Sequence, residues 1–344
     1  MIISLLLLVL IWTLPNQCNK IFTQRPQSQL LKFIAALLVV FGHQTLFYCN
    51  TSAFIKSETV LGDLCVAFFL FMSGYGLLYG YLNKGVTSLS GNWFIKHITK
   101  LAIPALTAMI LYTAAKVCIG QTIDWQHLLA WWFISNTNLP YGWYVSEIII
   151  LYIGFYICFR YVKSPYSLPI LCLAIVSAMG IMIVLKAPVW YIKGLPCFLI
   201  GMFLAKHDAK EKSSSHKIKP IRMKLIITMC IIIFYLLKDF YRLQELVPFL
   251  DKWRYTYMSF YLIDIVFIFI IGNVLMRIPL CNKMLNGGGG YFYEIYLVQG
   301  ATLLVCRETI PDDMAFIIIG LSVTAIVAKW MNALNKRISN LLLK

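Results

Sequence analysis

Apolar runs of about 20 residues recur along almost the whole chain, and this pattern constrains the fold more than any other feature, since a transmembrane α-helix needs a run of that length. Hydrophobic residues make up 60% of the 344 residues, charged residues only 13%, and the mean hydropathy is +0.77. So little polar surface cannot cover a water-soluble globule of this length. We therefore predict an all-α fold, a polytopic membrane helix bundle.

The apolar runs predict ten transmembrane helices. Residues 1–14 predict a short additional N-terminal helix or an uncleaved signal-like segment. We expect an N-terminal apolar segment with a cytosolic linker over residues 1–28, a single transmembrane domain over 29–336, and a cytosolic tail over 337–344. The ten spans are expected near residues 30–48, 61–82, 101–119, 143–161, 166–185, 189–205, 225–237, 257–276, 288–305 and 315–333.

The net charge of +16 comes from basic residues in the short gaps between the apolar runs. Twenty-one of the 30 lysines and arginines fall on one side of the predicted topology. Such a bias marks the cytosolic side, so we expect a multi-pass protein of the inner (cytoplasmic) membrane with its C-terminus in the cytosol. The position of the basic residues next to the membrane lipids accounts for the net positive charge of the chain. Binding of nucleic acid is therefore disfavoured as its explanation. The ten cysteines are scattered without metal-ligand spacing, so we expect neither a metal site nor a disulfide framework.

One histidine, His43, lies inside the first full-length span. The span has Lys32 near its start, and the 11 positions from Lys32 to His43 rise about 16 Å along a helix. His43 is therefore expected just past the bilayer midplane. An ionisable group at that depth indicates a function. Glu147 and Asp264 are expected in the same outer half of the membrane, and either carboxylate could orient the imidazole. The simpler interpretation for each carboxylate is a structural one, in which it forms hydrogen bonds with a neighbouring helix or with water.

A second cluster of ionisable residues precedes the third span. Lys96, His97 and Lys100 lie three or four residues apart, so they share one face if the helix has already begun. A basic face at the cytosolic interface attracts polyanions. Lipid headgroups and a phosphorylated cofactor such as coenzyme A both fit this chemistry.

Five sequence blocks together point to a known family. They are "LLKFIAALLVVFGH" with Lys32 and His43; Phe68–Tyr75, "FFLFMSGY"; His97 and Lys100 ahead of Pro104; Trp143 and Tyr144 with Glu147; and "YEIYLVQ" ending at Gln299. In this order, over roughly residues 29–330, they resemble the membrane acyltransferase-3 family. The chain departs from the family pattern at His97, where an arginine is usual, and at Gln299, where a histidine is common. We therefore assign Gln299 no proton chemistry.

The resemblance implies transfer of an acyl group, usually acetyl from acetyl-CoA, to a sugar hydroxyl of a cell-envelope or exported polysaccharide, which can be lipid-linked. His43 would be the general base, with Glu147 or Asp264 as the carboxylate that orients its other nitrogen; an acyl-histidine intermediate is a rival mechanism. No metal is implied. The donor would be bound by Lys32, Lys96, His97 and Lys100, and the acceptor by Ser73, Tyr75, Trp143 and Tyr144.

Two other classes of protein fit the same residues. A transporter or flippase of a lipid-linked sugar could use His43 and Glu147 as a proton relay. A non-catalytic assembly protein of an envelope complex is the other. Tryptophans near residues 125–143 are compatible with sugar stacking, but they are also typical membrane-interface anchors.

Overall fold

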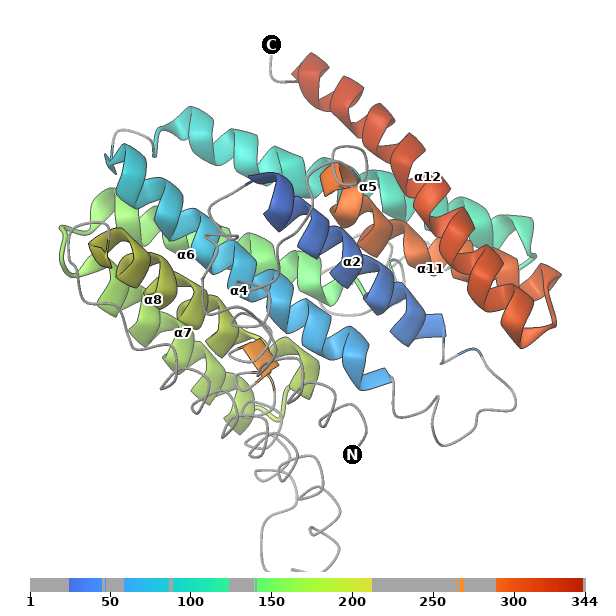
Figure 1. Cartoon of the computed structure of the whole chain (residues 1–344), viewed down its shortest axis with the longest axis horizontal. Helices are drawn as coiled ribbons and strands as arrows, with labels where there is room; N and C mark the ends of the chain where they lie inside the picture. Colours follow the sequence, from blue (N-terminus) through green and yellow to red (C-terminus); the bar gives the residue numbers. More distant parts are fainter. Residues whose placement is uncertain are drawn as a thin grey trace, which may run out of the picture. The chain divides into compact units, whose positions relative to one another are not determined.

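The computed structural model describes residues 25–44, 47, 59–86, 89–123, 139, 141–211, 264, 267–268 and 289–342. This part of the chain is helical and contains no strand, which confirms the predicted all-α class (Figure 1). Two short 3-10 helices, η4 (Val189–Tyr191) and η6 (Gly289–Tyr291), precede α-helices. The α-helices are α2 (Arg25–Gln44), α4 (Thr59–Lys84), α5 (Gly91–Cys118), α6 (Trp143–Tyr161), α7 (Ser167–Val184), α8 (Leu195–Glu211), α11 (Phe292–Thr309) and α12 (Asp313–Leu342).

Each of these eight helices overlaps one of the ten predicted spans. Five of them, α4, α5, α6, α7 and α12, are long and apolar enough to cross a membrane. The expected span at 225–237 and most of that at 257–276 lie outside the described residues, as does the short helix expected at 1–14. The structure therefore supports a multi-pass membrane protein, and the count of ten spans stays a prediction.

Helix α5 begins about ten residues before the apolar run that predicted it. The Ser90 side chain caps its first turn by accepting a hydrogen bond from the Trp93 N–H at 3.2 Å. The basic cluster that includes Lys96 and Lys100 is consequently helical. Pro104 lies inside α5 and, having no N–H, cannot make the usual hydrogen bond to the carbonyl four residues earlier.

The chain divides into two compact units. One unit contains Ala67–Lys84 of α4 together with Cys172–Leu285, which includes α8. Glycines allow α4 and α8 to approach closely within this unit. A Cβ on Gly201 would overlap the Phe71 carbonyl oxygen, and a Cβ on Gly74 would overlap the Phe198 carbonyl oxygen. Any side chain at either position would force the two helices apart.

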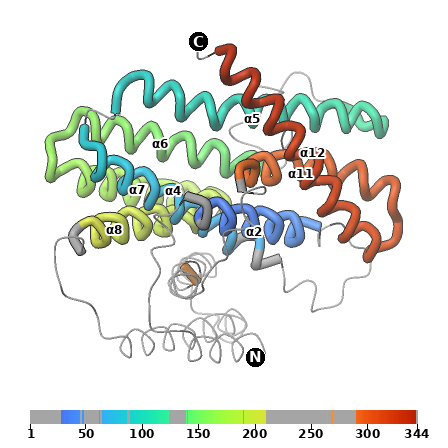
Figure 2. Tube along the Cα trace, turned by 45° about the horizontal axis from the view of Figure 1, so that its top comes forward, coloured from blue at the N-terminus to red at the C-terminus, as the bar shows by residue number. Residues whose placement is uncertain are grey.

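The other unit contains α2, α5, α6, α11 and α12. Within it, α11 packs against both α12 and α5, and Figures 1 and 2 show these three helices side by side. Buried hydroxyls link two of them: Thr302 of α11 and Thr324 of α12 share a hydrogen bond of 2.7 Å. Such bonds satisfy polar groups within an apolar bundle.

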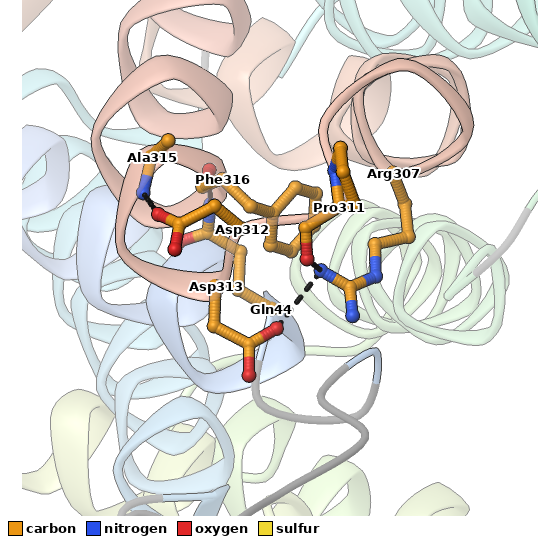
Figure 3. A network of polar contacts seen from close by, with 7 residues as sticks. All are labelled: Gln44, Arg307, Pro311, Asp312, Asp313, Ala315 and Phe316. Carbon is orange, nitrogen blue, oxygen red and sulfur yellow. Dashed lines mark hydrogen bonds and ion pairs between the residues drawn. The ribbon is translucent and has the colours of Figure 1, made fainter.

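The C-terminal end of α2 is fixed against α12. Gln44, which is fully buried, donates from Nε2 to the carbonyls of Phe316 (3.1 Å) and Ile317 (3.2 Å). Figure 3 shows Gln44 beside the turn from α11 to α12, where Arg307 pairs with Asp313 at 2.9 Å. Gln44 directly follows His43 in sequence. These contacts therefore set the position of the histidine.

Candidate functional site

His43 lies in the last turn of α2 and is half-buried. Its Nδ1 atom is 2.9 Å from Oε1 of Gln299 on α11. Helix α2 also meets the residue that precedes α11, because the rings of Phe33 and of Tyr291 in η6 pack edge to face with centroids 5.5 Å apart. The histidine is thus placed by two helices that are far apart in sequence.

The orientation of Gln299 fixes the tautomer of His43. Nε2 of Gln299 donates to the Tyr296 carbonyl at 2.8 Å, which leaves Oε1 facing the imidazole. An amide oxygen is only an acceptor, so His43 must carry a proton on Nδ1. In the neutral ring the lone pair is then on Nε2, the form required of a general base that acts through Nε2.

A turn before α6 brings Tyr141 onto the face of His43. The two rings stack with centroids 3.5 Å apart and an interplanar angle of 9°. The backbone of Tyr141 is left-handed, with φ of 65°, a conformation uncommon for residues other than glycine. Its carbonyl accepts a hydrogen bond of 2.6 Å from the Tyr296 hydroxyl. The turn is therefore held by the same helix that holds His43.

One face of α11 carries three polar side chains at three-residue intervals. Tyr293 donates to the Leu101 carbonyl of α5 at 3.1 Å, Tyr296 bonds to Tyr141, and Gln299 bonds to His43. Side chains three residues apart lie on the same side of a helix. From the first to the third of these residues the helix rises about 9 Å. This face connects α5, the turn before α6, and α2.

The start of α6 supplies the aromatic residues and the carboxylate that the sequence singled out. Trp143, Tyr144 and Glu147 are buried. The ring of Tyr144 packs edge to face against Tyr296, with centroids 5.1 Å apart. Glu147 lies near enough to the Tyr296 hydroxyl to influence it electrostatically. Glu147 therefore lies beside the α11 residue that binds the Tyr141 carbonyl, and its catalytic role stays a prediction.

Three predicted residues belong to the unit that contains α8. Tyr75 is fully buried and donates to Oδ2 of Asp208 at 2.8 Å, while Ser73 is half-buried on the same helix. Asp264 is also buried in this unit. The Tyr75 hydroxyl is thus engaged in linking α4 to α8 through Asp208.

The predicted basic face is present on α5. Lys96 and Lys100 are exposed. His97 instead stacks on Trp93, with ring centroids 4.0 Å apart, and its Nδ1 donates to the Trp93 carbonyl at 2.8 Å. Lys32 on α2 places its Nζ 5.3 Å from the centroid of the Phe292 ring. The two exposed lysines form the solvent-facing charge, and the histidine packs within an aromatic cluster.

Sequence reasoning missed the residues that contact His43 directly. Gln299 was assigned no proton chemistry, and Tyr141 was not among the predicted site residues. The spacing of Tyr293, Tyr296 and Gln299 was the available signal, because polar residues at three-residue intervals share one helix face.

Within the described residues, no group of three or more His, Cys, Asp or Glu side chains could hold a metal ion.

The helices and this site define a multi-pass membrane protein that holds His43 within a helix bundle, with its Nδ1 directed at Gln299. A family model described as an acyltransferase domain matches residues 26–331. The chain therefore belongs to the membrane acyltransferase-3 family and is a membrane acyltransferase. No curated protein and no solved structure matches the chain.

Proposed function

We propose that this acyltransferase moves an acetyl group from acetyl-CoA to a hydroxyl of a cell-envelope or exported polysaccharide at the inner membrane, with His43 as general base. The observation that carries the proposal is the pair of hydrogen bonds made by Gln299. They direct the protonated Nδ1 of His43 toward α11 and leave the basic lone pair on Nε2. An imidazole held in one tautomer is suited to accept a hydroxyl proton.

In the proposed reaction, Nε2 of His43 takes the proton of the acceptor hydroxyl as the oxygen attacks the thioester carbonyl. The tetrahedral intermediate collapses, and its carbon–sulfur bond breaks. The imidazolium then returns its proton to the leaving thiolate, so the products are the acetyl ester and the free thiol of coenzyme A. General base catalysis of this kind contributes about 10²–10⁴-fold in rate.

On the donor side, the exposed lysines of α5 support binding of the phosphates of acetyl-CoA. Lys96 and Lys100 lie on one helix face, at the end that positive-inside counting places in the cytosol. Lysine contributes to such contacts as a point charge. Lys32 is proposed to add a third charge. His97 is proposed to shape this surface through its stacking on Trp93.

On the acceptor side, we place the sugar near the aromatic start of α6, with Trp143 and Tyr144. Contacts of the acceptor with Ser73 and Tyr75 of α4 stay a prediction from the sequence. Aromatic faces pack well against the apolar faces of sugars. Glu147, buried in the same part of α6, is proposed to favour the positive charge that His43 acquires during the reaction.

The test is an assay of the purified protein with acetyl-CoA labelled in the acetyl group and crude envelope glycan from the source organism. We expect label in the glycan with the wild type and a loss of at least about 100-fold with His43→Ala. His207→Ala is the matched control, because His207 is an exposed histidine on α8. Near-normal turnover in a His43→Ala protein of wild-type thermal stability would remove His43 from the mechanism. Label retained on His43 of the protein would instead favour the acyl-histidine mechanism.

A further inference from the structure

Tyr141 covers one face of the His43 imidazole. The near-parallel stacking at 3.5 Å brings the whole phenol ring over the histidine. Two neutral aromatic rings prefer offset or edge-to-face packing over such a face-to-face arrangement. A cation over the face of a tyrosine ring, in contrast, is attracted by the electron-rich π system. The stacking geometry therefore suits an imidazolium better than a neutral imidazole.

The position of Tyr141 is imposed by the fold. Its left-handed backbone is uncommon for a side chain with a Cβ, and the Tyr296 hydroxyl holds its carbonyl at 2.6 Å. Gly142 follows in the tight turn, where a Cβ would approach the Leu139 carbonyl oxygen to 3.0 Å. An uncommon backbone conformation that is held in place by a neighbouring helix is typical of functional sites.

Tyr141 carries no charge of its own at physiological pH. Burial, with a smaller contribution from Tyr112, raises the pKa of its phenol to about 12. The ring therefore acts on His43 through its π face.

We propose that Tyr141 is a positioning residue that stabilises the imidazolium of His43 through a cation–π interaction, at the moment when the histidine has taken the acceptor proton. The proposal rests on the proposed role of His43 as general base. It assigns a function to a residue outside the proposed donor and acceptor contacts. Gln299 fixes the histidine in the plane of the ring, and Tyr141 acts on the perpendicular face.

The experiment replaces Tyr141 with phenylalanine and with 4-fluoro-, 3,5-difluoro- and 3,4,5-trifluorophenylalanine by genetic code expansion. Fluorine weakens the π face while leaving the size of the ring almost unchanged. The titratable groups near the stacked pair, which the series leaves in place, include Tyr293 and Tyr296 of α11, Tyr144 and Glu147 of α6, and Tyr112 of α5. The same series at Tyr161, an exposed residue at the end of α6, is the matched control.

Two readouts are measured in lipid nanodiscs: kcat of acyl transfer, and the pKa of His43 by nitrogen-15 NMR, assigned with His43→Ala. From phenylalanine to the trifluoro variant we expect kcat to fall about 5–10-fold and the pKa of His43 to fall by about one. The sign follows because a weaker π face destabilises the charged imidazolium. The series at Tyr161 should change neither readout.

The two readouts separate this inference from the proposed function. A pKa that falls along the series in a protein without acyl transfer would support the interaction and refute the role of His43 as base. Transfer that depends on His43, together with a flat pKa and a flat kcat along the series, would overturn the inference and leave the proposed function intact. A flat pKa with a falling kcat would also overturn it, because the ring would then act on the acceptor.

Discussion

Replacement of Gln299 by leucine removes the acceptor that fixes the His43 tautomer. The variant loses the 2.9 Å bond to Nδ1 and leaves a half-buried N–H without its Gln299 acceptor. An intramolecular hydrogen bond contributes about 1 kcal/mol net, and an unsatisfied buried donor costs about 1–3 kcal/mol. Every 1.4 kcal/mol is about tenfold in an equilibrium. If the proton moves to Nε2 to escape this penalty, the base is lost, so we expect kcat to fall about 10–100-fold.

The assay for Gln299 is the pH dependence of acyl transfer, because a merely structural role would not shift it. In Gln299→Glu, a carboxylate next to Nδ1 stabilises the imidazolium and raises the pKa of His43. His43 then stays protonated to higher pH, so the acid limb of the kcat/KM profile should move to higher pH. Thr309→Val is the matched control, since Thr309 lies on α11 but bonds to the carbonyls of Val305 and Cys306. An unmoved acid limb in a folded Gln299→Glu protein would refute the reasoning.

Two further predictions concern the binding of the donor and the membrane topology. Lys100→Ala should raise KM for acetyl-CoA about 2–5-fold with little change in kcat, because an exposed contact with a remote phosphate is made equally in the ground and transition states. The control Arg337→Ala, which removes another exposed cation, should leave KM for acetyl-CoA unchanged. A kinetic defect of Lys100→Ala that is confined to the acceptor would reassign Lys100 to lipid contact. Cysteine at Asp312 should react with a membrane-impermeant thiol reagent added outside intact cells, whereas cysteine at Lys96 should be spared; labelling at Lys96 from outside would invert the predicted topology.

The helices were predictable because a membrane imposes a length and an apolar composition on each one. The eight described helices overlap the apolar runs that predicted them. The ends were harder to predict. Helix α5 starts at Gly91, well before its apolar run, because the Ser90 cap and aromatic packing extend it into the polar interface. Helix α12 likewise continues to Leu342, past the expected end of its span.

The site was predictable at His43 and less so around it. A histidine in an apolar helix is conspicuous, since an ionisable group in lipid needs a partner or a function. Carboxylates were the expected partners because they carry charge, yet an amide from α11 binds Nδ1. The stacked Tyr141 depends on a left-handed backbone at a residue other than glycine, a conformation that local sequence disfavours and that Tyr296 stabilises from another helix. Partners that meet across 256 residues of chain leave no local signal.

Helix α11 connects the proposed donor side to the histidine. Tyr293 donates to the carbonyl of Leu101, which lies next to Lys100 and one turn before Pro104. Pro104 leaves the carbonyl of Lys100 without its usual helical donor, and Tyr293 bonds to the adjacent carbonyl of Leu101. Six residues further along the same face, Gln299 holds His43. The contacts of Tyr293 and Gln299 therefore relate His43 to Leu101 of α5 through about 9 Å of one helix. In the proposed reaction, α11 thus helps to set the distance between the basic face that would bind the donor and the base, together with the contacts of Gln44 with α12.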